Sequence, residues 1–395
     1  MTDLETRAAP SRAGALRRAA PALAGYAAVR ALGLLALFLW SAARDKSAYT
    51  LLTARWDALW YVRVAELGYG YEVRLANGDV HSNLAFFPLL PWLERLVAAV
   101  SPLSYADGGF LVSLVASFAA AWGIFAVADH VYGSRAGVCA VLLWAVLPVG
   151  IVQSMAYSES LFTALAAWSL YAVLTGRWVT AGALALLAGL TRPVGLAVVA
   201  AVWTAAAVSF VRDRRAADAD SPGTPAGRTT QARRVLGVVL APLGAAGYVL
   251  WVGHRTGKGP LGYLDVQAGW RNGFDGGYAF GRFVAEKFMS FPAALAGVGL
   301  ILGVASVVWL YVTGLRRRQP LPLLVYTGVV TALALCASSY FGSKPRLLLP
   351  AFPLLLPLAV ALAEARPRRS AAVLGSVAVA SAVYGAFWLN GSGPP

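Results

Sequence analysis

The chain has 395 residues, of which 59% are hydrophobic and 13% are charged, and its mean hydropathy is +0.65. Soluble domains carry about 25% charged residues, so this composition excludes a soluble protein and indicates a polytopic membrane protein. The formal net charge is +15, with many arginines in short clusters between apolar segments; basic residues there set membrane orientation, so we interpret the charge as topology rather than as a nucleic-acid-binding surface.

The first predicted element is an apolar segment over residues 22–43, which follows a polar N-terminal tail at residues 1–20. About 20 apolar residues are enough to cross a bilayer. Because the segment is long and lacks a clear cleavage site, we interpret it as a retained helix rather than a signal peptide. The four arginines of the tail predict a cytoplasmic N-terminus by the positive-inside rule, so residues 44–107 are expected outside.

Residues 44–107 form the expected first extracytoplasmic loop, which has no segment long and apolar enough to span. Residues 56–65 and 84–100 are nevertheless partly apolar. In the second stretch the apolar residues recur at helical spacing, which places Glu94 and Arg95 elsewhere on the helix surface. Both stretches are predicted to form helices that lie in the plane of the membrane interface.

The remaining apolar segments predict ten further spans, which makes about eleven transmembrane helices in all. They cover residues 108–129, 136–153, 157–175, 178–211 as a tight hairpin of two spans, 235–253, 292–314, 320–338, 346–364 and 371–389. Residues 212–234 are polar and arginine-rich and predict a flexible cytoplasmic loop, whereas residues 254–290 form a second extracytoplasmic loop. The expected fold is therefore all-α, with a single transmembrane domain over residues 1–395.

With this topology, several charged residues that are not in inner loops gather at the outer ends of the spans. They are Asp57 and Glu66 in the first outer loop, Glu159 at the start of the fourth span, Arg192 at the tip of the hairpin, and Lys344 and Arg346 before the tenth span. Such residues are candidate functional groups. Each also has a simpler interpretation. Asp57 would be a solvated acid in a loop, and Glu159 an acid at a helix start that interacts with the helix dipole. Arg192 and Arg346 would anchor the ends of spans at the lipid headgroups.

Asp57 is flanked by Trp56, Trp60 and Tyr61. An outward-facing acid near cations suits the transfer of a sugar from a lipid phosphate. The carboxylate would accept the proton of the attacking hydroxyl, and arginines would stabilise the departing phosphate with their charged, bidentate fork. The aromatic faces would suit both a lipid chain and a sugar ring.

Six short segments of the chain resemble motifs of the PIG-V-type GPI mannosyltransferase II family, in the same order. They are Arg55–Tyr61, Ala65–Tyr69, Ala85–Pro91, Tyr157–Phe162, Thr191–Pro193 and Pro345–Pro350. The resemblance implies a GT-C glycosyltransferase that takes mannose from a polyprenyl-phosphate donor, without a nucleotide sugar. The arginine- and alanine-rich composition suggests a bacterial member, which would have no GPI to build, so the acceptor is left open as a glycolipid, a glycan or a protein.

Carried over residue by residue, the resemblance implies that Asp57 is the general base of an inverting transfer. We assign Arg192 and Arg346 to the donor phosphate and Glu159 to sugar or acceptor binding. Further candidates for substrate contact are Trp56, Trp60, Tyr61 and Lys344. The chain has no second acid beside Asp57, and its only cysteines, Cys139 and Cys336, lie in apolar segments. We therefore expect no cofactor, no divalent metal and no zinc site.

Two functions other than catalysis stay open. The chain could be a flippase or transporter that binds a phosphate headgroup, or a non-catalytic partner subunit of such an enzyme. Transporters usually place polar groups at the bilayer midplane on broken helices, whereas the charges here fall at span ends. This favours an enzyme with its site on the outer face of the cytoplasmic membrane.

Overall fold

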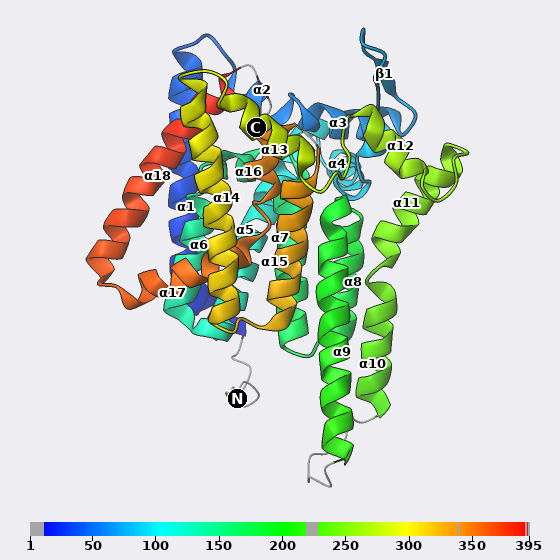
Figure 1. The fold of residues 1–395 in the computed structure, drawn as a ribbon, viewed down its shortest axis with the longest axis vertical. Coiled ribbons are helices and arrows are strands. Elements are labelled where there is room, and N and C mark those ends of the chain that lie inside the picture. Colours follow the sequence, from blue (N-terminus) through cyan, green and yellow to red (C-terminus); the bar gives the residue numbers. More distant parts are fainter. Residues whose placement is uncertain (1–11, 219–227, 339, 392, 394–395) are drawn as a thin grey trace.

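The computed structural model describes residues 12–218, 228–338, 340–391 and 393, and these form an almost entirely helical bundle (Figure 1). Long helices run side by side, and shorter helices and a two-stranded hairpin lie across the upper end. The expectation of an all-α, polytopic membrane protein is confirmed. The part of the N-terminal tail at residues 1–11, and residues 219–227 of the expected cytoplasmic loop, lie outside the described residues.

Six helical segments of the described chain are long and apolar enough to cross a membrane. They are α1 (Arg12–Ala42), α5 (Tyr105–Tyr132), α9 (Leu196–Asp218), α10 (Arg228–Leu240) continued by α11 (Leu243–Arg255), α14 (Ala293–Arg316) and α18 (Pro367–Leu389). A seventh candidate is a broken pair, Phe341–Leu347 with Phe352–Glu364, whose two parts are bent by 75°. Four shorter apolar helices are α6 (Ser134–Ala145), α7 (Ser158–Leu174), α8 (Trp178–Gly189) and α15 (Leu321–Cys336). Each expected span thus corresponds to a helix or to a pair of helices.

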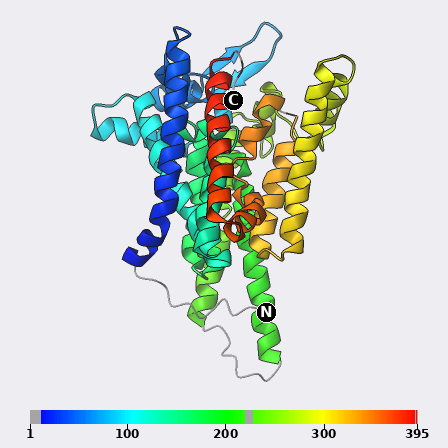
Figure 2. The same cartoon turned by 90° about the vertical axis from the view of Figure 1, so that its left-hand side faces the viewer.

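The two loops that are expected outside the membrane, called the first and second outer loops, build the upper layer in Figure 1. The first contributes α2 (Ala48–Thr53), α3 (Asp57–Leu67), strands β1 (Glu72–Arg74) and β2 (Val80–Ser82), the 3-10 helix η1 (Asn83–Ala85) and α4 (Leu89–Val100), and the second contributes α12 (Gly262–Gly269) and α13 (Tyr278–Lys287). The strands pair antiparallel, with Val73 opposite His81. Helices α3 and α4 are the two that the sequence predicts at the interface. α1 begins at the lower end of the bundle and α18 ends at the upper end (Figure 2).

Helix α4 exposes several apolar residues and buries one of its two charged residues. Leu96 and Val100 are exposed, whereas Glu94 is completely buried. Arg95 donates hydrogen bonds to the carbonyl oxygens of Val64, at 3.3 Å, and Ala65 at the end of α3. The Val64 carbonyl also accepts a hydrogen bond from the Gly68 N–H at 3.0 Å, so the guanidinium adds to the cap at the C-terminal end of α3. An apolar outer side is the arrangement expected of a helix that meets lipid at the interface.

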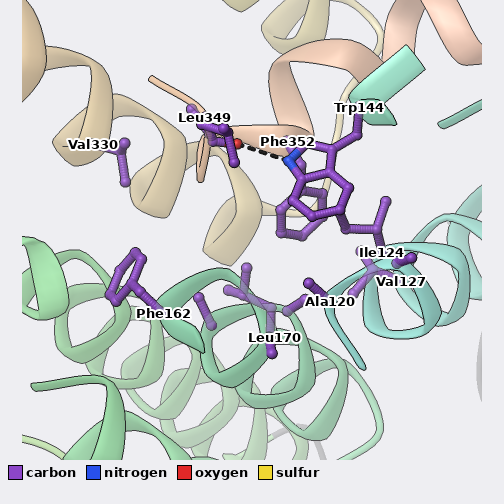
Figure 3. Packing of buried hydrophobic residues seen from close by; sticks show 14 of the residues in the cluster. Ala120, Ile124, Val127, Trp144, Phe162, Leu170, Val330, Leu349 and Phe352 are labelled. Carbon is purple, nitrogen blue, oxygen red and sulfur yellow. Dashed lines mark hydrogen bonds between the residues drawn. The ribbon is translucent and has the colours of Figure 1, made fainter. Parts of the chain in front are cut away.

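The central core joins the first half of the chain to its last third. The buried ring of Trp144 on α6 packs near Ile124 and Phe352 (Figure 3), and its Nε1 donates a hydrogen bond to the carbonyl oxygen of Leu349 at 3.0 Å. Indole N–H groups need such a partner when they are buried. The contact ties α6 to the broken segment that follows α15, and it helps to fix the position of that segment.

The broken segment consists of the 3-10 helix η4 (Phe341–Ser343), α16 (Lys344–Leu347), η5 (Phe352–Leu355) and α17 (Leu356–Glu364). Pro345, Pro350, Pro353 and Pro357 recur through it. Proline lacks the backbone N–H of a regular helix and clashes with the preceding turn, so this sequence cannot continue as one straight helix. The break leaves Arg346 on a short turn inside the bundle rather than on a regular span.

Helices flank both sides of the expected cytoplasmic loop. α9 continues to Asp218 and α10 begins at Arg228, and Arg234 of α10 pairs with Asp213 of α9 at 2.8 Å. The described parts of residues 212–234 are therefore helical. In Figure 1 the lower end of α9 extends beyond the other helices.

Candidate functional site

Four charged residues that the sequence singled out meet in one cluster near the upper end of the bundle. Asp57 is the first residue of α3, Glu159 lies in the first turn of α7, Arg192 precedes the 3-10 helix η3 (Pro193–Gly195) between α8 and α9, and Arg346 lies in α16. The first three positions are helix starts, and all four interrupt or border regular helices. The topology therefore brings together segments that are far apart in the chain.

Arg346 is the residue that links the two acids. Its Nη1 donates a hydrogen bond to Asp57 Oδ2 at 2.7 Å, and its Nε lies 3.4 Å from Glu159 Oε1. The same Glu159 oxygen forms an ion pair with Arg192 Nη1. Two arginines and two carboxylates thus alternate in a chain, and their formal charges cancel.

The two acids differ sharply in exposure. The Glu159 side chain is 1% exposed and the Asp57 side chain is 27% exposed. A buried carboxylate is stable only where cations or hydrogen-bond donors compensate for lost hydration, and Glu159 has two arginines in contact. Asp57 is the most open member of the cluster, so it is the acid that a molecule arriving from outside can reach.

Both acids also lie in the first turn of a helix. A carboxylate there interacts favourably with the positive end of the helix dipole, as the simpler interpretation of Glu159 proposed. The ion pairs show that this local contribution is accompanied by long-range contacts to Arg192 and Arg346. In the sequence, the interruptions of the apolar segments and the family-like motifs pointed to Arg192 and Arg346, but not to their contacts with Glu159.

Aromatic and hydroxyl groups line the inner side of the cluster. The Tyr157 ring lies under the Arg346 guanidinium, 5.1 Å from its carbon. Ser158 Oγ accepts a hydrogen bond from Arg192 Nη1 at 3.3 Å and lies 2.7 Å from the Tyr61 hydroxyl. Tyr61 thus lies beside the cluster, and its contact with substrate stays a prediction. Tyr157 and Ser158 were not singled out as site residues, although they directly precede Glu159.

The two tryptophans lie in other surroundings. Trp60 stacks on Phe86, with centroids 5.7 Å apart, and meets Trp270 of the second outer loop edge-on at 4.8 Å. The Trp56 ring lies 4.5 Å from the Arg55 guanidinium carbon. Trp60 therefore belongs to an aromatic contact between the two outer loops, which is adjacent to the site because Tyr61 also contacts Phe86.

Lys344 points its ammonium at backbone carbonyls. Its Nζ donates to Ala334 O and Ala337 O at 2.8 Å each and to Leu335 O at 3.2 Å, at the C-terminal end of α15. The end of a helix presents such carbonyls without helical partners and attracts cations. In this arrangement Lys344 holds the broken segment against α15, and the structure does not bring it into the cluster of Asp57 and Glu159.

The described residues contain no group of three or more His, Cys, Asp or Glu side chains arranged to hold a metal ion. The two acids of the cluster each contact an arginine instead. The expectation that the protein uses no divalent metal or other cofactor stays a prediction. Cys139 and Cys336 are both free.

No protein-family model matches the chain, and no curated protein is significantly similar to it in sequence. Solved structures do match. ArnT from Cupriavidus metallidurans bound to undecaprenyl phosphate gives a TM-score of 0.53 at 15% identity over 89% of this chain and 63% of that chain. The oligosaccharyltransferase AglB from Archaeoglobus fulgidus, in complex with an inhibitory peptide and a dolichol-phosphate, gives 0.48 at 13% identity over 94% of this chain and 56% of that one.

The chain thus spans less than two thirds of the length of these two proteins. At 15% identity the likeness to ArnT concerns the fold, and it agrees with the fold class expected from the sequence. The chain is a multi-pass membrane protein with a GT-C fold.

Proposed function

We propose that this protein is a membrane glycosyltransferase that moves mannose from a polyprenyl-phosphate donor to an acceptor outside the cytoplasmic membrane. The observation that carries the proposal is the position of Asp57, a partly exposed carboxylate 2.7 Å from Arg346. Arg346 also contacts Glu159, which in turn pairs with a second arginine, Arg192. A base and two permanent cations at one outer site match the needs of sugar transfer from a lipid phosphate. The GT-C fold shared with ArnT, whose structure holds undecaprenyl phosphate, supports the same class of donor.

In the proposed reaction, the acceptor hydroxyl oxygen attacks the anomeric carbon of the donor sugar from the face opposite the phosphate. Its proton passes to Asp57, the bond from the anomeric carbon to the phosphate oxygen breaks, and the electron pair stays on the phosphate. The products are the glycosylated acceptor, with inverted configuration, and the polyprenyl phosphate. Arg346 and Arg192 stabilise the charge that develops on the leaving phosphate, because guanidinium groups bind phosphate oxygens in pairs.

The identity of the sugar rests on the resemblance of the first outer loop, Arg55 to Pro91, to the PIG-V-type family. The proposed acceptor is a cell-envelope glycolipid, a glycan or a protein, and the N-terminus is proposed to be cytoplasmic. Trp56 and Trp60 line the outer loop and are proposed to contact the lipid or sugar rather than the phosphate. For Glu159, burial favours contact with the two arginines over contact with the sugar.

One observation favours the second candidate, a flippase or transporter. Arg346 lies on the broken pair of helices that is bent by 75°, and transporters use broken helices to bind substrate. In that function Asp57 and the arginines would bind a phosphate headgroup and no glycosidic bond would form. The two functions differ in whether a labelled sugar leaves its lipid.

The proposal is tested with membranes that contain the full chain and are supplied with radiolabelled polyprenyl-phosphate mannose. The wild type is expected to transfer label to an endogenous acceptor, and Asp57→Asn is expected to lose transfer. Glu72→Gln, which alters an exposed acid of the same loop outside the family-like motifs, is the matched control and should keep the activity. Equal transfer by the Asp57→Asn protein would exclude Asp57 as the base, and label that crosses the membrane while still attached to its lipid would favour the transporter.

A further inference from the structure

Arg346 contacts two carboxylates that differ in one decisive property. Glu159 is enclosed, whereas Asp57 is open to the outside. The contact with Glu159 is on the inner side, where the Tyr157 ring also lies against the guanidinium. An incoming ligand can therefore replace Asp57 as a partner of Arg346, while the inner contacts stay in place.

The donor phosphate and Asp57 compete for the same cation. A phosphodiester carries one negative charge, and the cluster that receives it has no net formal charge, because its two arginines already face two carboxylates. Asp57 and the phosphate repel each other at short distance. Because the Arg346 contact at 2.7 Å is a charge-assisted hydrogen bond, it is among the strongest that a phosphate would have to replace.

We propose that the donor phosphate displaces Asp57 from Arg346, so that the base is released only when the donor is bound. Glu159 is the positioning residue of this exchange: it contacts both Arg192 and Arg346 from the buried side. This inference rests on the proposed function, since it assigns an order to the same site. The donor binds first, Asp57 then loses its guanidinium partner and turns to the acceptor hydroxyl.

The exchange also explains what happens after transfer. Asp57 has then taken up the acceptor proton and is neutral, so it no longer competes with the lipid phosphate for Arg346. The product phosphate stays on the arginines until Asp57 loses that proton to solvent and pairs with Arg346 again. Release of the lipid product is thereby coupled to the return of Asp57 to its charged state.

The test uses undecaprenyl phosphate, the lipid of the ArnT structure, and the purified full chain in lipid nanodiscs. Asp57→Asn removes the competing charge and is expected to bind this lipid about tenfold more tightly than the wild type, in line with a charged hydrogen bond worth about 1.5 kcal/mol, although it loses transfer. Asp57→Ser should show the same tightening and serves where the asparagine variant folds poorly. Glu72→Gln should leave the affinity unchanged.

Glu159→Gln is expected to weaken lipid binding and to raise the KM for the donor more than it lowers kcat, and Glu159→Asp should restore part of the affinity. A merely structural role would lower the amount of active protein without changing KM. If Arg346→Gln weakens lipid binding but both Asp57 variants bind no more tightly than the wild type, the exchange is wrong and the phosphate assignment stands. If Arg346→Gln leaves lipid binding unchanged, the phosphate assignment itself fails.

Discussion

Arg346 Nη1 lies 2.7 Å from Asp57 Oδ2, although 289 positions separate the two residues in the chain. The contact joins the first outer loop to the broken segment near the end of the bundle. Helices α3 and α16 are both short, so contacts with other parts of the protein are needed to fix the positions of Asp57 and Arg346. The Trp144 contact with Leu349 holds the broken segment, and the Arg95 cap holds the end of α3.

Replacement of Arg346 by lysine should not preserve the site. The guanidinium reaches Asp57 through Nη1 and Glu159 through Nε, whereas an ammonium is a single compact charge that lacks this fork. We expect Arg346→Lys to lower kcat/KM by about 10- to 100-fold, the loss of one charged hydrogen bond. The measurement is the rate of mannose transfer at varied donor concentration, with Arg282→Lys on the exposed surface of α13 as control. Wild-type kinetics in the Arg346→Lys protein would contradict the two-contact role.

Glu159 and Arg192 form an ion pair inside the protein, so their contributions to the free energy of unfolding should be strongly coupled. Removing one member leaves the other charge buried without its partner, which costs about 3–5 kcal/mol. We expect Glu159→Ala and Arg192→Ala each to destabilise the protein strongly, and the double variant to lose less than the sum of the two. Thermal unfolding in detergent micelles measures this, and Asp265→Ala, which removes an exposed pair with Lys258, should change little. Additive losses would contradict the coupling.

The sequence was sufficient to predict the helices and the gathering of the site residues at one end of the bundle, because the lengths and ends of the apolar segments carry that information; the side of the membrane stays a prediction. It also identified Asp57, Glu159, Arg192 and Arg346 as one group. It could not predict which cation pairs with which acid, because that depends on how α7 and the broken segment pack. Lys344 shows the limit most clearly: it donates hydrogen bonds to backbone carbonyls seven to ten residues before it, at the end of α15, and its place beside Arg346 in the sequence predicted the cluster instead.

Glu94 is a second residue whose surroundings the sequence did not predict, and these surroundings predict that the stability of the protein depends on pH. The sequence placed this acid away from the apolar side of α4, and the structure buries it completely, with no hydrogen-bond partner for either carboxylate oxygen among the described residues. A Cβ added at Gly109 would lie 2.5 Å from Glu94 Oε1, so only glycine there leaves room for it. Burial raises the pKa of the Glu94 carboxyl well above its usual value.

The raised pKa sets the sign of the effect on stability. At pH values between the two pKa values, the folded protein keeps Glu94 protonated, whereas the unfolded chain, with a glutamate pKa of about 4.3, has already lost the proton. The stability that Glu94 contributes is therefore complete below the unfolded pKa and is lost as the pH rises toward and through the raised folded pKa. Glu94→Gln should flatten the dependence of the melting temperature between pH 5 and pH 8, since glutamine does not titrate. An unchanged slope in the Glu94→Gln protein would show that other groups cause it.

Lys344→Met tests whether Lys344 holds the second outer loop in place. Methionine keeps much of the aliphatic stem and removes the ammonium that contacts Ala334, Leu335 and Ala337. Residue Ala337 also forms a bridge with Phe274 of the second outer loop, and the Lys344 ammonium lies 4.8 Å from the Phe280 ring. Loss of the charge should weaken the contact of the second outer loop with the end of α15, so we expect faster amide hydrogen exchange in residues 273–283.

The matched control is Lys258→Met, which alters an exposed lysine of the same loop and should leave exchange there unchanged. Donor KM should rise less in the Lys344→Met protein than in the Arg346→Gln protein, because Lys344 supports the segment without contacting either acid of the cluster. A loss of donor affinity as large as that of Arg346→Gln, with normal hydrogen exchange in the second outer loop, would instead place the Lys344 ammonium at the phosphate.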